Sequence, residues 1–325
     1  MRIRILGSAA GGRFPQWNCG CGNCAAVRKS AVREDVRENA GEGKFPGKAR
    51  TQAQLALSAD GSAWFLAGAS PDLAFQIESS PDLHPRALRD SPVAGVVLGS
   101  CDLDHVVGLL LLRELQPLRV YAAPSILRIL REENSMFGML NRVEPQVVWT
   151  PMNSGALFPL LSAYGKDSGL RCEVHYLSGR YPRYVKTEPA SLARNEATAA
   201  LFFESESESK SDSASGRSVA YVPAVGSLSD ALLEKIRGVD LLLFDGTFWS
   251  DDELIRVQGS GETAHQMGHI PVEESLRLLK NVKVGRRMFI HLNNTNPILN
   301  EASPEYQAVR QAGWEVAEDN WQLEL

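Results

Sequence analysis

Runs of apolar residues alternate with amphipathic stretches along most of the chain. Short apolar runs bounded by glycine, proline or polar clusters predict β-strands, and apolar residues that recur every three or four positions predict helices. The chain begins with a strand at 1–9, and an Asp-Gly turn at 60–61 joins two strands into a hairpin. Further strands are expected at 93–100, 118–124, 218–223, 240–248 and 286–294.

Helices are expected between these strands, at 24–34, 71–79, 101–115, 125–134, 229–238 and 271–282. Short strands and loops alternate from about 140 to 200, and residues 314–325 end the chain as a hairpin or an edge strand. Residues 204–217 are polar and of low complexity, which is typical of a disordered loop insertion. The alternation of strands and helices predicts an α/β or α+β fold, with residues 1–325 forming a single domain.

Composition narrows the class of protein. The chain has 325 residues, of which 44% are hydrophobic and 22% charged, as in an ordinary globular protein. Its net charge of −5 argues against a general nucleic-acid binder but not against a local basic pocket. The apolar runs are too short for a signal-peptide core or a membrane span. We therefore expect a cytoplasmic protein with no membrane partner.

Three cysteines, Cys19, Cys21 and Cys24, form a C-x-C-x-x-C cluster. A disulfide would leave one thiol over and is rare in a reducing compartment. A thioredoxin-like pair at Cys21 and Cys24 would need a particular βαβ context. Three thiols spaced by glycines favour a structural zinc site, which needs a fourth ligand from elsewhere. Candidates for that ligand are His269, His291 and the amide-rich loop near Asn294.

A second concentration of ligand-type residues follows the predicted strand at 93–100. Asp102, Asp104 and His105 come directly after the strand and lead into a helix. The carboxyl ends of strands are where α/β folds build their sites, and carboxylates with an imidazole suit zinc, iron or manganese. The alternative is a helix N-cap, which explains one aspartate well but explains the whole Asp-x-Asp-His group poorly.

Two later strands end in the same way. Asp245 closes an apolar strand before a glycine, and His291 closes another before a run of asparagines. Either residue alone could be a turn former or a structural histidine. Because strand ends converge in space, three such ends together favour a site. His269 lies in a Gly-His turn before a helix, where a loop-capping role is the simpler explanation.

The strand-end Asp-x-Asp-His resembles the H-x-H-x-D-H signature of the metallo-β-lactamase superfamily, with Ser100 and Asp102 at the positions of two of its histidines. Further segments resemble one branch of it, the pyrroloquinoline quinone (PQQ) biosynthesis protein B family, and they extend from the first strand to the last. They are LGSAAGGRFPQWNCGCGNC, ARTQ, ASPDL, DHVVGLLLLRE, FDGTFWSDDE, MGHIP and IHLNNTNPIL.

The resemblance implies a four-layer αββα sandwich with the site at one edge of the sheets. It also implies a structural Zn²⁺ on the three cysteines. The residues that it implies around an active-site metal are Asp102, Asp104, His105, Asp245, His269 and His291. Of these, His105, His269 and Asp104 are expected to be the catalytic core.

A site with few histidines and several carboxylates suits Fe²⁺, with zinc as the ion that a purified sample could carry instead. The resemblance implies iron- and oxygen-dependent hydroxylation of the tyrosine ring in a Glu–Tyr-derived precursor. A carrier for PQQ or its precursor is one alternative, and a zinc-dependent phosphodiesterase-like hydrolase is another.

The expected ligand is thus a small peptide-derived or quinone molecule. From residue type alone, Arg50 and Asn294 are candidates to bind its carboxylates or carbonyls. Other PQQ biosynthesis proteins could bind the chain, and it could form a homodimer.

Overall fold

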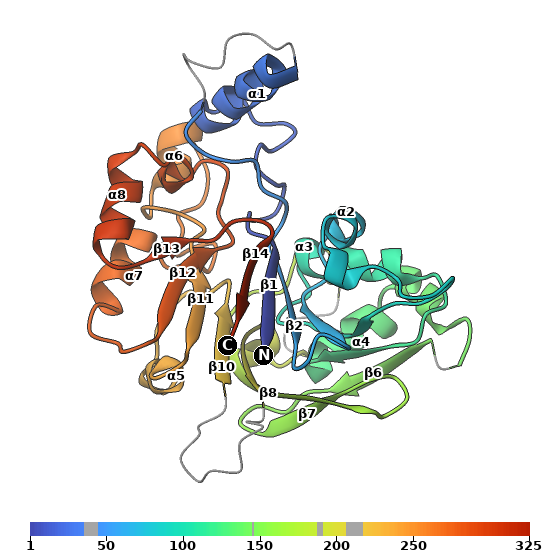
Figure 1. Cartoon of the computed structure of the whole chain (residues 1–325). Helices are drawn as coiled ribbons and strands as arrows, with labels where there is room; N and C mark the ends of the chain where they lie inside the picture. The colour runs from blue at the N-terminus through green and yellow to red at the C-terminus, as the bar shows by residue number, and fades with distance from the viewer. Residues whose placement is uncertain (36–44, 145, 187–190, 206–216) are drawn as a thin grey trace.

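Two seven-stranded sheets lie face to face, and helices cover the outer face of each (Figure 1). This computed structural model describes residues 1–35, 45–144, 146–186, 191–205 and 217–325. The first sheet has the order β14-β1-β2-β3-β4-β5-β6, and the second has the order β13-β12-β11-β10-β9-β8-β7. The expected αββα sandwich is therefore confirmed. The description of the chain as a single domain stays a prediction.

The first sheet consists of β1 (Arg2–Gly7), β2 (Gln54–Ser58), β3 (Trp64–Ala67), β4 (Val93–Val97), β5 (Leu118–Ala122), β6 (Val147–Pro151) and β14 (Trp321–Glu324). The second consists of β7 (Leu157–Leu161), β8 (Asp167–Leu177), β9 (Thr198–Ser205), β10 (Arg217–Val222), β11 (Leu241–Asp245), β12 (Arg286–Ile290) and β13 (Glu315–Val316). The helices are α1 (Gly22–Asp35), α2 (Leu73–Glu78), α3 (Leu103–Val106), α4 (Pro124–Arg131), α5 (Asp230–Ile236), α6 (Glu253–Gln258), α7 (Val272–Leu278) and α8 (Pro304–Gln311).

Strand β11 shows why its sequence is a continuous apolar run. Leu241 and Leu243 point into the core between the two sheets, whereas Leu242 and Phe244 belong to the core between the second sheet and its helices. Successive side chains of a strand point to opposite faces, so a strand covered on both faces must be apolar at every position. The run ends at Asp245, the last residue of the strand, which is itself buried.

Parallel pairing brings the chemically important strand ends to one side of the sandwich. Strand β11 runs parallel to β12, with Asp245 opposite Ile290, so that Asp245 and His291 leave the second sheet at the same edge. In the first sheet, β4 runs parallel to β3 and β5, and the chain leaves its carboxyl end toward Asp104 and His105. Both sheets thus deliver residues to a single edge of the sandwich.

The expectation of one regular α-helix at 101–115 is wrong. One α-helical turn, α3, is followed by a 3₁₀ segment, η2 (Val107–Leu112). At Gly108 the backbone passes so close to a neighbouring loop that a Cβ atom would lie 2.3 Å from the Ser70 carbonyl oxygen. Gly108 N also donates to Ala69 O at 2.8 Å. This backbone-to-backbone packing replaces the regular helix.

Two further expectations can be compared with the structure. Of the two alternatives for residues 314–325, the edge strand is confirmed and the hairpin is wrong, since β13 and β14 are edge strands of different sheets. The predicted loop at 204–217 is too wide at both ends. Glu204 in β9 pairs with Ser218 in β10, so ladder hydrogen bonds hold these flanks. Residues 206–216 lie outside the described residues.

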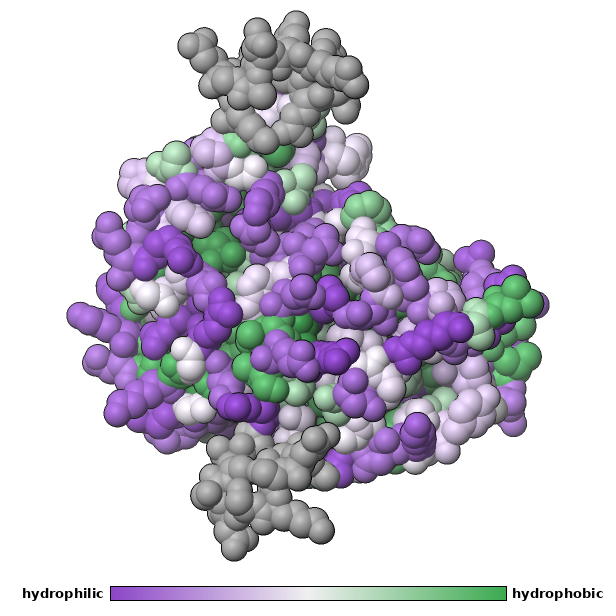
Figure 2. Space-filling view, viewed as in Figure 1, coloured by the Kyte–Doolittle hydropathy of each residue, from purple (hydrophilic) through white to green (hydrophobic). Residues whose placement is uncertain are grey.

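The face seen in Figure 2 is mostly hydrophilic, with apolar side chains in separate patches. This agrees with the burial of the large apolar residues in the three cores between the layers. Within the described parts of the chain, every helix is too short or too polar to cross a bilayer.

Candidate metal centre

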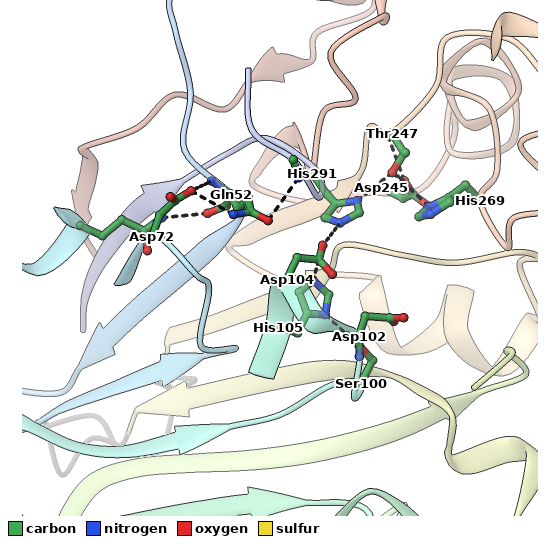
Figure 3. Close-up of polar contacts among 12 residues, drawn as sticks. Gln52, Asp72, Ser100, Asp102, Asp104, His105, Asp245, Thr247, His269 and His291 are labelled. Carbon is green, nitrogen blue, oxygen red and sulfur yellow. Dashed lines mark hydrogen bonds and ion pairs between the residues drawn. The ribbon is translucent and has the colours of Figure 1, made fainter. Parts of the chain in front are cut away.

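Asp104, His105 and His291 bring three ligand-type atoms together at the edge of the sandwich (Figure 3). These atoms lie within 4.8 Å of one another. Asp104 Oδ2 is 3.3 Å from His291 Nε2 and 3.8 Å from His105 Nε2. Two imidazole nitrogens and one carboxylate oxygen form a set that suits Fe²⁺ or Zn²⁺ and leaves coordination positions open.

The ring of His105 is oriented by Ser100, the residue that stands where the superfamily signature has a histidine. Ser100 Oγ lies 2.8 Å from His105 Nδ1. With Nδ1–H donating to the serine, Nε2 carries a lone pair, and this buried nitrogen has no hydrogen-bond partner. A buried ring nitrogen left unpaired beside a carboxylate fits a metal ligand.

Thr247 orients the second histidine. Its hydroxyl donates to Asp245 Oδ1 at 2.7 Å and lies 2.9 Å from His291 Nδ1. Because the only hydroxyl hydrogen goes to Asp245, the ring nitrogen at Thr247 must be the donor, which leaves His291 Nε2 as an acceptor. That nitrogen faces the Asp104 carboxylate, so the two acceptors need a proton or a cation between them. The residues therefore fit a bound metal ion.

The backbone of His291 is unusual and supports a functional reading. Its φ of 61° lies in the left-handed region, which few residues other than glycine adopt. Such a conformation costs free energy and tends to persist where the surrounding structure requires a particular side-chain direction. Here it ends β12 with the imidazole buried between Asp104 and Thr247.

Asp245 forms a second group with His269 and His291. Its Oδ2 accepts from His269 Nδ1 at 2.8 Å and from Val225 N at 3.0 Å. Its Oδ1 accepts from the hydroxyl and the backbone N–H of Thr247. A carboxylate has about four acceptor positions, and all are taken. Asp245 is thus placed to orient imidazoles, and His269 is directed to Asp245 instead of completing the trio expected with Asp104 and His105.

The electrostatics of the group favour an ionised Asp104. Burial alone would raise the pKa of Asp104, but the neighbouring imidazoles of His105 and His291 lower it well below its usual range. For Asp102, burial prevails and raises the pKa. Burial opposes protonation of His269, but the Asp245 carboxylate outweighs it and raises the pKa of His269.

A cavity of about 620 Å³ opens beside these residues. Asp102, Asp104, His105, His269 and His291 all line it. Its volume is within the range of sites that take small molecules, about 300–1,000 Å³. Asp102 is the N-cap residue of α3 but makes no side-chain capping hydrogen bond, so its carboxylate is free to face the cavity.

The three cysteines form a separate group. The sulfur atoms of Cys19, Cys21 and Cys24 lie within 4.8 Å of one another, and all three thiols are free. The Asn294 side-chain amide faces them, with Nδ2 3.1 Å from Cys19 Sγ and 3.4 Å from Cys24 Sγ. Burial raises the pKa of Cys24 to about 11. The trio fits a zinc ion because three sulfur atoms lie close enough to bind one ion together.

The two groups share one loop. Asn293 N donates to Thr247 O at 3.0 Å, and Asn296 Nδ2 donates to Gly246 O at 2.8 Å. His291 thus stands at one end of the loop and Asn294, beside the cysteines, lies three residues later. The cysteine group consequently fixes the segment that carries His291.

Neither predicted substrate-binding residue lines the cavity. Arg50 is only 3% exposed and donates to Ser8 Oγ and Ala317 O. Asn294 is occupied by the cysteines. These placements do not support direct contacts between either residue and a substrate in the cavity. The prediction rested on residue type, which carries no information on burial.

The sequence reasoning missed Thr247 and two cavity-lining arginines, Arg180 and Arg183. A threonine two residues after a strand-end aspartate could have been noticed as a turn partner. The arginines lie in a loop without any periodic pattern.

Comparison with known proteins agrees with this geometry. Residues 63–292 match the Beta-lactamase superfamily domain. Coenzyme PQQ synthesis protein B of Methylobacterium radiotolerans is 40% identical over 330 residues, covering 100% of both chains. The crystal structure of Zn(2+)-bound PqqB from Methylobacterium extorquens matches with a TM-score of 0.85 and 36% identity, again over 100% of both chains.

The chain belongs to the coenzyme PQQ synthesis protein B family. This confirms the resemblance drawn from the sequence motifs. A diphosphatase of the PhnP family has the same fold, with a TM-score of 0.64 at 18% identity. At that identity the likeness extends to the fold alone. The chemistry of this chain within the family therefore depends on the residues of its own site.

Proposed function

We propose that this protein acts in PQQ biosynthesis as an Fe²⁺- and O₂-dependent hydroxylase of the tyrosine ring in a Glu–Tyr-derived precursor. Family membership supports the pathway. The observation that carries the reaction type is the convergence of two imidazole nitrogens and one carboxylate oxygen on one point of the cavity wall. Fe²⁺ held by such a set supplies the one-electron chemistry with O₂ that side chains lack.

In this proposal Asp104, His105 and His291 hold the iron. Ser100 and Thr247 keep the two rings in the tautomer with Nε2 unprotonated, and their hydrogen bonds resist ring rotation. The stoichiometry places one oxygen atom of O₂ in a ring C–H bond of the tyrosine, giving a second ring hydroxyl and so a catechol. The other atom leaves as water and consumes two protons and two electrons from an external reductant.

His269 is the residue proposed to move a proton. Its Nδ1–H donates to Asp245, so Nε2 is the nitrogen left to exchange a proton with substrate in the cavity. The Asp245 carboxylate favours the protonated ring and raises the pKa of His269. This is the same division of work as in other Asp–His pairs, where the carboxylate sets the tautomer and stabilises the imidazolium.

We further propose that Cys19, Cys21 and Cys24 hold a structural Zn²⁺. The Asn294 side-chain amide is proposed to complete the set: its Nδ2 faces all three sulfurs, and a half-turn of the amide would present Oδ1, the atom with a lone pair for zinc, in its place. Four closed ligands are typical of zinc that stabilises a fold and takes no part in chemistry. This zinc would fix the loop that carries both Asn294 and His291.

The test is an anaerobic Fe²⁺ loading followed by ¹⁸O₂, ascorbate and a Glu–Tyr peptide carrying a hydroxylatable ring. Mass spectrometry should show the gain of one labelled oxygen atom, and none in a protein loaded with zinc at both sites. Tight quinone binding without oxygen gain would instead support a carrier. Turnover of a phosphodiester by the zinc-loaded protein would support a hydrolase.

A further inference from the structure

Two arginines stand in the wall of the cavity that contains Asp104, His105 and His291. Arg180 and Arg183 belong to the loop that follows β8, and both line the cavity. Their side chains are 72% and 95% exposed, so water reaches both guanidinium groups. Neither takes part in the metal group, and the mechanism above gives them no role.

Both arginines face the same carboxylate. Arg180 Nη1 lies 3.3 Å from Glu262 Oε1, and Arg183 Nη2 lies 3.9 Å from Glu262 Oε2. Glu262 follows α6 and also lines the cavity. The structure therefore shows a place at the cavity where one carboxylate lies between two guanidinium groups. Exposed pairs of this kind contribute little to stability, so folding does not require them.

The charge balance of this part of the cavity is unequal. Two fixed positive charges meet one negative charge, and arginine does not lose its proton near neutral pH. The planar guanidinium group binds carboxylates through paired N–H donors. A ligand carboxylate that displaced Glu262 would keep both guanidinium contacts.

We propose that Arg180 and Arg183 form the carboxylate-binding site for an anionic aromatic substrate, and that Glu262 occupies this site until the substrate arrives. The substrate class rests on the function proposed above, because a Glu–Tyr-derived molecule carries ionised carboxylates at neutral pH. The arginines hold the carboxylates while the aromatic ring lies toward Asp104, His105 and His291. They act as specificity residues and not as metal ligands.

A purely structural role for the three residues makes a different prediction. If the ion pairs only fastened two loops together, loss of Glu262 would act like loss of either arginine. If Glu262 competes with the ligand, Glu262→Gln strengthens binding while Arg180→Gln and Arg183→Gln weaken it. The opposite signs separate the two roles without any catalytic assay.

The experiment measures binding of PQQ, which carries carboxylates, and of the ester in which every carboxylate of PQQ is methylated, to the metal-free and the zinc-loaded protein. Arg180→Gln and Arg183→Gln should each raise the Kd of PQQ roughly five- to tenfold and leave that of the ester unchanged. Glu262→Gln should lower the Kd of PQQ. Arg237→Gln is the matched control, since Arg237 forms a similar exposed pair with Glu234 on α5, away from the cavity lining.

Unchanged Kd values in both arginine variants, or weaker PQQ binding in Glu262→Gln, would overturn the proposal. Its failure is distinguishable from failure of the hydroxylase proposal. If the iron-loaded protein never hydroxylates a substrate but the binding pattern holds, the carboxylate site stands and the hydroxylase falls. If hydroxylation continues with unchanged KM in both arginine variants, the hydroxylase stands and the carboxylate site falls.

Discussion

Thr247→Val tests the way in which the candidate metal site is built. Valine has nearly the shape of threonine but no hydroxyl, so the change removes three contacts and little volume. The lost contacts are the donation to Asp245 Oδ1 at 2.7 Å, the acceptance from His291 Nδ1 at 2.9 Å and the longer contact to His269 Nδ1 at 3.1 Å. His269 keeps its own bond to Asp245, so the effect should concentrate on His291.

The size of the effect follows from what each partner keeps. Asp245 retains the backbone N–H of residue 247 at 3.0 Å and two donors on its other oxygen. His291, which is 7% exposed, loses the acceptor of its Nδ1–H. One buried donor without a partner costs about 1–3 kcal/mol. Because that cost falls on the metal-binding tautomer, we expect metal affinity to drop roughly ten- to a hundredfold.

The assay is Co²⁺ titration of the metal-free protein, with the Kd obtained by competition against a chelator. The cysteine group provides an internal reference, because its thiolate-to-cobalt absorption should be unaffected by the change. Thr247→Ser keeps the hydroxyl and should bind metal as the wild type does. If Thr247→Val folds normally and binds cobalt at the histidine site within a factor of two of the wild type, the reasoning is refuted.

Four other predictions follow from the structure. Burial raises the pKa of Glu253 from 4.5 to about 7, so between these pH values the folded state holds one more proton than the unfolded state. The free energy of unfolding should therefore fall by about 3 kcal/mol as the pH rises from 4.5 to 7. Urea titrations should show this pH dependence in the wild type and not in Glu253→Gln, and an equal dependence in both would contradict it. Cys24→Ser should remove one equivalent of zinc, measured by metal analysis, and lower Tm by at least ~4 °C, measured by calorimetry. An unchanged zinc content would show that the cysteines hold no zinc. His105→Ala should abolish hydroxylation, and unchanged turnover would rule out the site. Asn294→Ala should speed the loss of zinc to a chelator. Asn294→Asp keeps an oxygen ligand and should lose zinc at the wild-type rate. Equal rates of zinc loss in the two variants would exclude a ligand role for Asn294.

Much of the architecture could be predicted from the chain alone. The apolar runs that become β4, β11 and β12 are long enough to be recognised as buried strands, and their ends carry His105, Asp245 and His291 or lie close to them. Parallel strands place their carboxyl ends at one edge, so the meeting of these residues followed from the pattern. The three cysteines lie within six consecutive positions, so local spacing was enough to predict that they meet.

The pairing within the site could not be predicted in the same way. Which histidine joins Asp104 depends on the left-handed backbone of His291 and on the hydrogen bond between His269 and Asp245. Both are consequences of side-chain directions, which differ among residues with the same position at a strand end. The expectation that His269 joins His105 and Asp104 in the catalytic core stays a prediction, because no local pattern fixes these directions.

What the sequence by itself determined is an α/β or α+β class and the strand ends that carry ligand-type residues, because hydrophobic periodicity fixes which faces are buried. The four layers were expected only from the resemblance to the metallo-β-lactamase superfamily. Only the tertiary structure decided that Asn294 faces the cysteines, that Arg50 is buried, and that Arg180 and Arg183 share one carboxylate at the cavity. These residues lie outside regular elements or meet partners far away in the chain. Their positions depend on how separate loops pack over the ends of the two sheets, and no local pattern encodes that packing.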